Sequence, residues 1–344
     1  MSRFRDEIGE QPDIAAGMLG AGRAAIQSIG ARIKEAGPRG FVIAARGSSD
    51  HAALYAKYLL GRRNRALVSL AAPSLFTHYA SRPRLDGQCV IGISQSGSSP
   101  DVVAVIEEGA RQGALTVAIT NHPESRLAAA AELVVALGAG PERSVPASKT
   151  YTASLLALAL LSQAIDPQPA FEAALAQVPR ALGEALGREA DLDRLVPALL
   201  GPRAIVLGRG FNLATAEEVA LKLTETSYVL ARAWSVADFA HGPIAVVDEG
   251  FPILFVGGGG VVAADLEEVA RRLEGYGCRV LGIFDGDACG IGKESAVAID
   301  SGLPEDLTPL PLAVLGQLLA HRVAASRGID PDNPRALNKV TRTW

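Results

Sequence analysis

Residues 41–60 read FVIAARGSSDHAALYAKYLL, and residues 204–223 repeat the pattern as AIVLGRGFNLATAEEVALKL. Each copy runs from an apolar stretch rich in β-formers through an Arg-Gly pair and a small polar turn into a helical pattern. A second repeat follows, because 89–121 and 251–285 both read strand, Gly/Ser loop, helix, Gly turn and strand. Short apolar strands that alternate with helices are typical of βαβ units with a parallel sheet. We therefore expect an α/β protein with two similar domains.

The composition narrows the class of protein. Hydrophobic residues make up 49% of the 344 residues and charged residues 20%, which supports a large core and excludes intrinsic disorder. The net charge of -4 argues against a nucleic-acid partner. The three cysteines, Cys89, Cys278 and Cys289, show no CxxC spacing, so we expect a reducing compartment without disulfides or a zinc site. With no signal peptide and no long apolar span, the expectation is a cytoplasmic protein with no membrane partner.

The domain organisation follows from the repeat and from shifts in composition. We expect a helical segment over 1–30, a first domain over 31–166, a partly helical linker over 167–194, a second domain over 195–329 and a tail over 330–344. Two prolines, Pro331 and Pro334, prevent a regular helix in the tail. The tail still carries Leu337 and Val340, which could dock it, with Lys339 between them.

The loop SQSGSSP (94–100) is the first candidate ligand site. It follows a predicted strand, and Pro100 begins a predicted helix, so backbone N–H groups, hydroxyls and a helix dipole meet there. Those donors suit a phosphate monoester. An ordinary capped turn is the alternative, but four serines in six residues exceed what one cap needs, and the counterpart at 257–260 is GGGG. The nucleotide-binding Gly patterns are absent, so we expect no nucleotide. No residue spacing suggests a metal or redox cofactor, and we expect neither.

A second loop, RGSSD (46–50), follows the predicted strand 41–45. A capped helix start is again the alternative reading. Neighbouring strand ends of a doubly wound sheet can converge on one ligand. We therefore favour Ser48 and Ser49 as hydroxyl contacts to a sugar phosphate.

The predicted helix 211–231 carries Glu218, Lys222 and Glu225 on one face. A Glu–Lys pair at this spacing is commonly a surface pair worth only ~0.2–0.5 kcal/mol. The functional alternative is a carboxylate held near a cation for proton transfer. Further along, His241 stands in a His-Gly-Pro turn, where an imidazole is a natural acid/base group near neutral pH.

Six segments together resemble the sugar isomerase (SIS) domain family. They are ARGSS (45–49), SQSGSSPD (94–101), ERSVPASKTYT (142–152), EEVALKLTETSY (217–228), HGPIA (241–245) and NPRALNKVTRT (333–343). The resemblance covers nearly the whole chain. Within this family the segments look like the double-SIS isomerase half of glutamine–fructose-6-phosphate amidotransferase and like stand-alone glucosamine-6-phosphate deaminases. It implies two flavodoxin-like αβα sandwiches, each with a parallel sheet, in a homodimer.

The resemblance also implies residue roles. Four residues of the first loop match the positions that bind the sugar phosphate in the family: Ser94, Gln95, Ser96 and Ser99. Ser49 matches a contact to a sugar hydroxyl, and Glu225 matches the base that moves a proton between C1 and C2. The residues that support this base are Glu218 and Lys222. His241 matches the group for ring opening, which in the family reaches the partner subunit's site, and Lys339 matches a tail lysine that forms an imine with the ketose.

Two departures from the family bear on the activity. The amidotransferase has an N-terminal glutaminase domain with a terminal cysteine, whereas this sequence opens at Met1-Ser2 and EIGEQPD (7–13) looks like the start of the isomerase half. Glutamine-dependent synthesis by this chain alone is therefore not expected. The second departure is Pro146, which follows Val145 in a stretch that contacts sugar in the family, so substrate preference stays open.

The expected reaction is conversion of glucosamine 6-phosphate and water to fructose 6-phosphate and ammonia. A fructosamine-6-phosphate deglycase, a plain phosphosugar isomerase and a non-catalytic sugar-phosphate sensor remain alternatives. The sensor is disfavoured because the sequence shows no helix-turn-helix or basic DNA-binding segment, and because acid/base residues would be superfluous for binding.

Overall fold

The computed structural model describes residues 2–339, so Val340 of the expected tail lies outside the described residues. The chain divides into two compact units, which we name by their strands. The β1–β5 unit takes residues 13–142, 149–176 and 338–339 of the described chain, and the β6–β10 unit takes 2–12, 143–148 and 177–337. Each unit is an α/β domain of its own, as the repeat predicts.

The β1–β5 unit is built on a five-stranded sheet in the order β2-β1-β3-β4-β5, and all its strand pairs are parallel. The strands are Phe41–Ala44 (β1), Val68–Leu70 (β2), Cys89–Ile93 (β3), Leu115–Thr120 (β4) and Leu133–Ala136 (β5). Every residue of β3 and β4 is buried, because helices cover both faces of the sheet.

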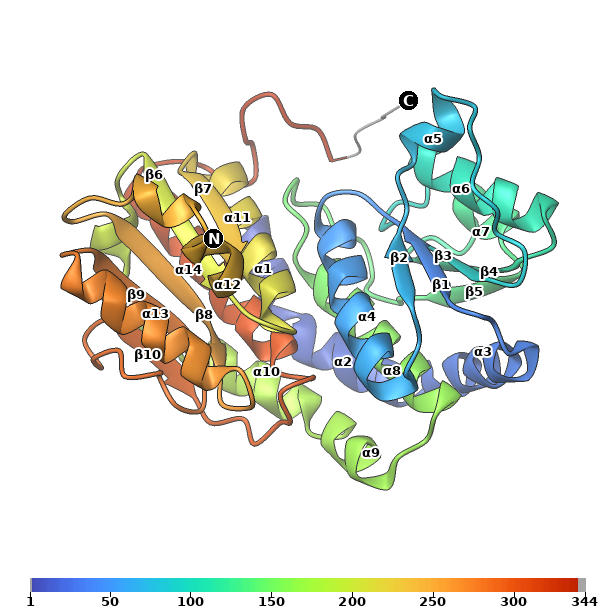
Figure 1. Ribbon diagram of the computed structural model, residues 1–344, viewed down its shortest axis with the longest axis horizontal. Helices are drawn as coiled ribbons and strands as arrows, with labels where there is room; N and C mark the ends of the chain where they lie inside the picture. The colour runs from blue at the N-terminus through green and yellow to red at the C-terminus, as the bar shows by residue number, and fades with distance from the viewer. Residues whose placement is uncertain (1, 340–344) are drawn as a thin grey trace. The chain divides into compact units, whose positions relative to one another are not determined.

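Two groups of helices form the outer layers of this unit. One group contains Arg23–Ala36 (α3), Ser48–Asn64 (α4), Lys149–Ile165 (α8) and Pro169–Leu175 (α9). The other contains Ser74–Thr77 (α5), Pro100–Arg111 (α6) and Arg126–Ala130 (α7). Figure 1 shows α4 and α8 on one side of the sheet and α6 and α7 on the other. Helix α8 lies between α3 and α4, which is why nearly all of its residues are buried.

The β6–β10 unit repeats this plan. Its strands are Arg203–Gly208 (β6), Leu230–Ser235 (β7), Pro252–Gly258 (β8), Arg279–Asp285 (β9) and Ala296–Ile299 (β10). The order β10-β9-β8-β6-β7 is the order of the other sheet read from its opposite edge, and the pairs are again parallel. The predicted fold class is therefore confirmed.

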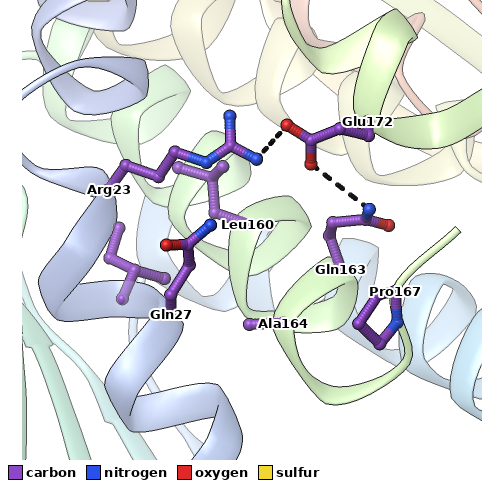
Figure 2. Close-up of a pocket in the computed structure, with 8 residues that line it drawn as sticks. Arg23, Gln27, Leu160, Gln163, Ala164, Pro167 and Glu172 are labelled. Atoms are coloured by element: carbon purple, nitrogen blue, oxygen red, sulfur yellow. Dashed lines mark hydrogen bonds and ion pairs between the residues drawn. The ribbon is translucent and has the colours of Figure 1, made fainter. Parts of the chain in front are cut away.

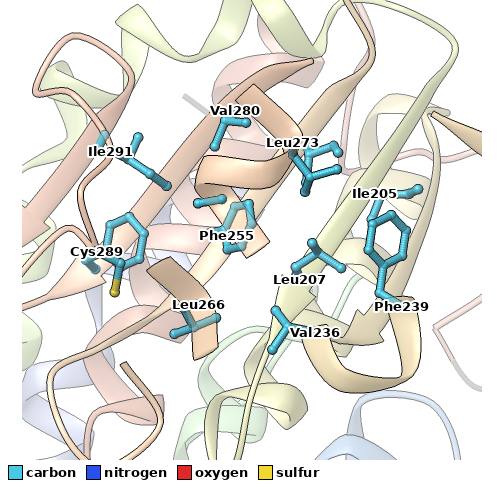
Figure 3. Close-up of a cluster of buried hydrophobic side chains, with 14 of the residues drawn as sticks. Ile205, Leu207, Val236, Phe239, Phe255, Leu266, Leu273, Val280, Cys289 and Ile291 are labelled. Atoms are coloured by element: carbon cyan, nitrogen blue, oxygen red, sulfur yellow. The ribbon is translucent and has the colours of Figure 1, made fainter. Parts of the chain in front are cut away.

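The core of the β6–β10 unit forms where one face of its sheet meets Val236–Ala240 (α12) and Ala263–Gly275 (α13). Leu207, Phe255, Leu266 and Leu273 are completely buried there (Figure 3). Burying side chains of this size contributes about 1.5–3 kcal/mol each. The unit also contains the helices Val178–Gly187 (α10), Asn212–Ser227 (α11) and Pro309–Ser326 (α14).

Three sequence expectations need correction or detail. The helix predicted over 211–231 ends at Ser227, because Tyr228 adopts a left-handed backbone with φ of 55° and the next residues form β7. The segment 167–194 is largely helical, since it holds α9, α10 and the 3-10 turn Glu189–Arg194. Segment 1–30 holds Arg3–Gly9 (α1), Gln11–Leu19 (α2) and the start of α3.

The three cysteines are free thiols, two of them buried. Burial raises the pKa of Cys89 to about 12 and that of Cys289 to about 11, so neither is a reactive thiolate near neutral pH. Among the helices of residues 2–339, none combines the length and the apolar character needed to cross a bilayer.

Candidate functional site

The strand order of the β1–β5 unit places two predicted loops side by side. Strands β1 and β3 are hydrogen-bonded neighbours, so their carboxyl ends lie together. The connections leave β1 and β3 in opposite directions along the sheet, and such a switch point is where ligands bind in open α/β sheets. The loops at this edge are 45–47, before α4, and 94–99, before α6.

The loop after β3 presents hydroxyls in a fixed backbone. The Ser94 and Ser99 hydroxyls lie 3.3 Å apart, and Ser96 Oγ accepts a hydrogen bond from Ser98 N at 3.3 Å. Gly97 has φ of +61°, and a Cβ at this position would lie 2.0 Å from Ser125 Oγ. Only glycine fits such a backbone against such a neighbour. The half-exposed Ser96 and Ser99 can therefore meet an anion at the start of α6.

An ion pair joins the two loops. Arg46 Nε donates to Asp101 Oδ2 at 2.6 Å, and the Asp101 side chain is only 1% exposed. Because Arg46 balances this carboxylate, the first turn of α6 stays compatible with a bound anion. Ser48 and Ser49, the first residues of α4, lie half-buried beside it. The predicted hydroxyl contacts and the predicted phosphate loop thus share one edge of one sheet.

Lys339 belongs to the same unit and has a defined partner. Its Nζ donates to Glu142 Oε2 at 2.6 Å. The Glu142 side chain is fully buried, whereas that of Lys339 is 23% exposed. Thr150 also donates to this carboxylate, through its N–H at 3.1 Å and its hydroxyl at 2.8 Å. Glu142 thus binds a predicted site residue, although the sequence analysis assigned Glu142 no role.

Helix α11 of the β6–β10 unit carries the predicted acid/base set. Lys222 Nζ lies 3.4 Å from Glu218 Oε1 and 2.5 Å from Glu225 Oε2. The side chains of Glu218 and Lys222 are each 1% exposed, whereas that of Glu225 is 23% exposed. This burial excludes the surface-pair alternative for Glu218 and Lys222. A buried ion pair adds little net stability, so stability alone does not account for the cluster.

Two other predicted residues lie in the β6–β10 unit. His241 follows α12 and is exposed. Val145 is half-buried in the loop 143–148, which Glu7 of α1 holds. The Glu7 carboxylate accepts from Arg143 N at 2.5 Å and from the N–H and hydroxyl of Ser144.

The predicted site residues therefore form two sets. The β1–β5 unit holds Ser48, Ser49, Ser94, Gln95, Ser96, Ser99 and Lys339, and the β6–β10 unit holds Val145, Glu218, Lys222, Glu225 and His241. In the β1–β5 unit the loops that carry Ser49 and Ser96 share one edge of the sheet, and in the β6–β10 unit Glu218, Lys222 and Glu225 share α11. Their roles remain predictions.

A hollow of about 240 Å³ lies elsewhere in the β1–β5 unit, among α3, α8 and the segment that leads into α9 (Figure 2). Three of its polar side chains pair with one another, since Arg23 contacts Glu172 and Gln163 Nε2 donates to Glu172 at 3.2 Å. It contains none of the predicted site residues. The hollow offers no chemistry comparable to that at the strand ends.

Comparison with known proteins matches both repeats to one family. Residues 37–164 and 201–321 match the SIS domain. The chain is 31% identical over 343 residues to the isomerizing glutamine–fructose-6-phosphate aminotransferase of Thermococcus kodakarensis, which is 97% of this chain and 56% of that protein. This chain thus spans about half the length of the curated relatives it matches.

Solved structures agree with the sequence match. A candidate phosphosugar isomerase from Silicibacter pomeroyi DSS-3 gives a TM-score of 0.86 at 32% identity, covering 96% of this chain and 100% of that chain. The C-terminal domain of glucosamine-fructose-6-phosphate aminotransferase from Francisella tularensis gives 0.88 at 25% identity, covering 97% and 98%. The chain belongs to the SIS domain family.

Proposed function

We propose that this chain is a phosphosugar aldose–ketose isomerase, and that its reaction releases ammonia from glucosamine 6-phosphate to give fructose 6-phosphate. The observation that carries the proposal is the α11 cluster, in which a buried lysine contacts two carboxylates and only Glu225 reaches solvent. The names of the relatives support the isomerase chemistry, because both aminotransferases act on hexose 6-phosphates by name.

The serine loop takes the phosphate in this proposal. Hydroxyls of Ser96 and Ser99, the N-terminus of α6 and the neighbouring Ser49 supply donors to a monoester. Binding energy from the phosphate end is remote from C1 and C2, so it serves to orient the reacting carbons.

Glu225 is the proposed base. It removes the C2 proton of the open-chain amino sugar and returns it at C1, through an enolamine. The fructose imine that results is hydrolysed to the ketone and ammonia. Lys222, 2.5 Å from Glu225, steadies the carboxylate or the developing oxyanion. His241 assists ring opening, and no metal or redox cofactor takes part in this scheme.

The deciding variant is Glu225→Gln, assayed as ammonia release from glucosamine 6-phosphate without glutamine. Removal of the base is expected to lower kcat about 1,000-fold or more, with binding of the sugar phosphate retained. Glu217→Gln is the matched control, because its glutamate lies on the same helix without a proposed role. Near-normal turnover in Glu225→Gln would eliminate this residue as the base.

A substrate panel separates the alternatives. Ammonia from glucosamine 6-phosphate supports the deaminase, release of an amine from a fructosamine 6-phosphate adduct supports a deglycase, and ketose–aldose exchange alone supports a plain isomerase. Binding of sugar phosphates with no turnover would identify a sensor.

The proposed homodimer is tested by mixing two inactive variants. Exposed His241 is proposed to serve the partner subunit's site. Subunits carrying Glu225→Gln and His241→Asn should then partly restore activity in a mixed dimer. If confirmed subunit exchange restores nothing, each site is built within one chain.

A further inference from the structure

The repeat between the units extends to a pair of glutamates. Pro141-Glu142 and Pro304-Glu305 both follow the last strand of a sheet, and each glutamate is the sixth residue after its strand, counted from Ala136 and from Ile299. Each lies in the loop that leads to the long helix of its unit, α8 or α14. The fold therefore offers two equivalent carboxylates whose surroundings can be compared.

The two carboxylates have different partners. Glu305 is half-buried, and its Oε2 accepts from Val261 N at 3.4 Å, so it holds the loop after β8. Glu142 is fully buried, and its Oε2 accepts from Lys339 Nζ at 2.6 Å. Holding a loop is enough to explain the contact that Glu305 makes. It does not explain why a lysine, Lys339, binds the buried Glu142 carboxylate.

Thr150 fixes the Glu142 carboxylate from the protein side. The Thr150 N–H donates to Oε1 at 3.1 Å and its hydroxyl donates to Oε2 at 2.8 Å. Donors at both oxygens offset the desolvation of a buried charge and set the plane of the carboxylate. The Lys339 side chain stays 23% exposed, so a carbonyl compound can approach the amine while the carboxylate stays covered.

We propose that Glu142 positions Lys339 and carries its protons while the amine condenses with the carbonyl of a ketose phosphate. This inference rests on the proposed function, since it assigns Lys339 the imine-forming role that the resemblance implies. It adds the buried carboxylate, which can accept and return the protons of the condensation.

The proton transfers balance with Glu142 as the only carrier. The carboxylate takes one proton from the Lys339 ammonium, and the free amine attacks the ketose C2 as the carbonyl π pair moves to oxygen. Glu142 gives that proton to the oxygen, which forms the carbinolamine. It then takes a second proton from nitrogen and passes it to the hydroxyl, so that water leaves and the C=N bond forms. Glu142 ends as a carboxylate, and Lys339 ends as a protonated imine.

Borohydride trapping tests the step directly. The protein is incubated with fructose 6-phosphate and borohydride, and intact mass with peptide mapping follows the reduced adduct at Lys339. In Glu142→Gln the trapping rate should fall at least about tenfold. It should also keep rising with pH where the wild-type rate has levelled, because only solvent can then deprotonate the amine. Glu305→Gln, the matched control, should trap at the wild-type rate.

The outcomes separate the inference from the function on which it rests. If the wild-type protein yields no adduct at Lys339, the imine role itself fails. If wild-type and folded Glu142→Gln protein trap at the same rate with the same pH profile, Glu142 has no part in the condensation and the inference is overturned. Should Glu142→Gln not fold, Thr150→Val keeps the carboxylate and removes one donor. It should slow trapping about two- to tenfold, and an unchanged rate would again overturn the inference.

Discussion

The two units share a sheet order and differ in what stands at the ends of their strands. Both join the first strand's loop to the helix after the third strand by an ion pair: Arg46–Asp101 at 2.6 Å in one unit, and Arg209–Asp265 at 3.1 Å in the other. Both helices begin with an acidic residue in the first turn. This shared link shows that the scaffold at the switch point is common to the two units.

The loops beside this link differ. The β1–β5 unit presents serine hydroxyls over 94–99, whereas the β6–β10 unit presents four glycines over 257–260, the first two inside β8. A Cβ at Gly260 would lie 2.5 Å from Glu305 Oε2. In the second unit a carboxylate of the chain itself therefore lies against the loop, and a phosphate there would meet a like charge.

The helices after the first strands differ in the opposite sense. In the aligned repeat, Glu218 and Lys222 of α11 correspond to Tyr55 and Leu59 of α4. All four are buried. Since the same fold packs an aromatic and an aliphatic residue at these positions, the charges of α11 are not required by the architecture. The two units therefore differ by local substitutions on a common scaffold: serines at one strand end, and buried charges on one helix.

The largest expected effect on stability comes from replacing Lys222 of α11 by leucine, the residue at the equivalent position of α4. Lys222→Leu leaves the Glu218 carboxylate buried beside an apolar group, and we expect a loss of about 3–5 kcal/mol in the free energy of unfolding. Adding Glu218→Met should restore most of that stability without restoring turnover. Chemical denaturation and ammonia release measure the two effects.

The double variant is the informative one. A protein that stays as unstable as Lys222→Leu alone would show that the charged pair is needed for packing. The comparison with α4 would then mislead.

A smaller effect is expected from the two glycine loops. Gly97→Ala requires a left-handed alanine whose Cβ would lie 2.0 Å from Ser125 Oγ, so we expect a loss of about 2–4 kcal/mol and weaker binding of the sugar phosphate. Gly259→Ala is the matched control, since a Cβ there has no neighbour within 4 Å. It should change stability by less than about 0.5 kcal/mol. Equal effects in thermal unfolding and in KM would contradict the distinction between the loops.

The smallest expected effect is a difference in pH dependence. Burial raises the pKa of Asp285, at the end of β9, although hydrogen bonds from Ser301 partly oppose it. The folded state therefore binds more protons than the unfolded state, and the contribution of Asp285 to stability falls as pH rises from about 4 through its folded pKa. Asp285→Asn should flatten the fall in unfolding midpoint over this interval.

In the β1–β5 unit, Glu108 has a pKa shift of the opposite sign. The side-chain hydrogen bond from Arg111 lowers the pKa of Glu108 to about 2 despite burial. Its contribution is present above its ordinary pKa near 4.5 and is lost as pH falls toward 2. Glu108→Gln should weaken the loss of stability in acid and leave the higher interval unchanged. A common slope change in both variants would point to general electrostatics instead.

The sequence predicts the fold well because the repeat is visible both in the hydrophobic pattern and in the Gly, Ser and Pro residues of the turns. Apolar strands of three to seven residues alternate with helices, and helices start at Pro100 and soon after the Arg-Gly pairs. The family is confirmed, and the loop 94–99 lies at the predicted edge of the sheet. The sequence pattern does not determine the strand order, because strand pairing depends on contacts between segments far apart in sequence.

Burial and partner choice are the parts that spacing does not determine. The i, i+4 pattern of Glu218 and Lys222 is the same on a solvent face as on a covered one, and only packing of α11 against α14 and the sheet separates them. Glu142 gave no chemical signal of its own, since its partner Lys339 is almost two hundred residues away. Two signals could have pointed to it: Glu142 begins the segment ERSVPASKTYT (142–152) that carries the family resemblance, and a Pro-Glu pair stands at the equivalent place in the second repeat.

The carboxylate of Glu7 has a consequence for dissecting this protein. It holds residues 143 and 144, the start of the segment 143–148 of the β6–β10 unit. The residues that flank this segment, 142 and 149, belong to the β1–β5 unit. The chain thus passes from one unit to the other and back, and no single peptide bond divides it into two intact halves. A fragment that contains only the second repeat would lack the segment 143–148, which belongs to the β6–β10 unit. Each unit is therefore a poor module for transplantation, although each contains a complete sheet.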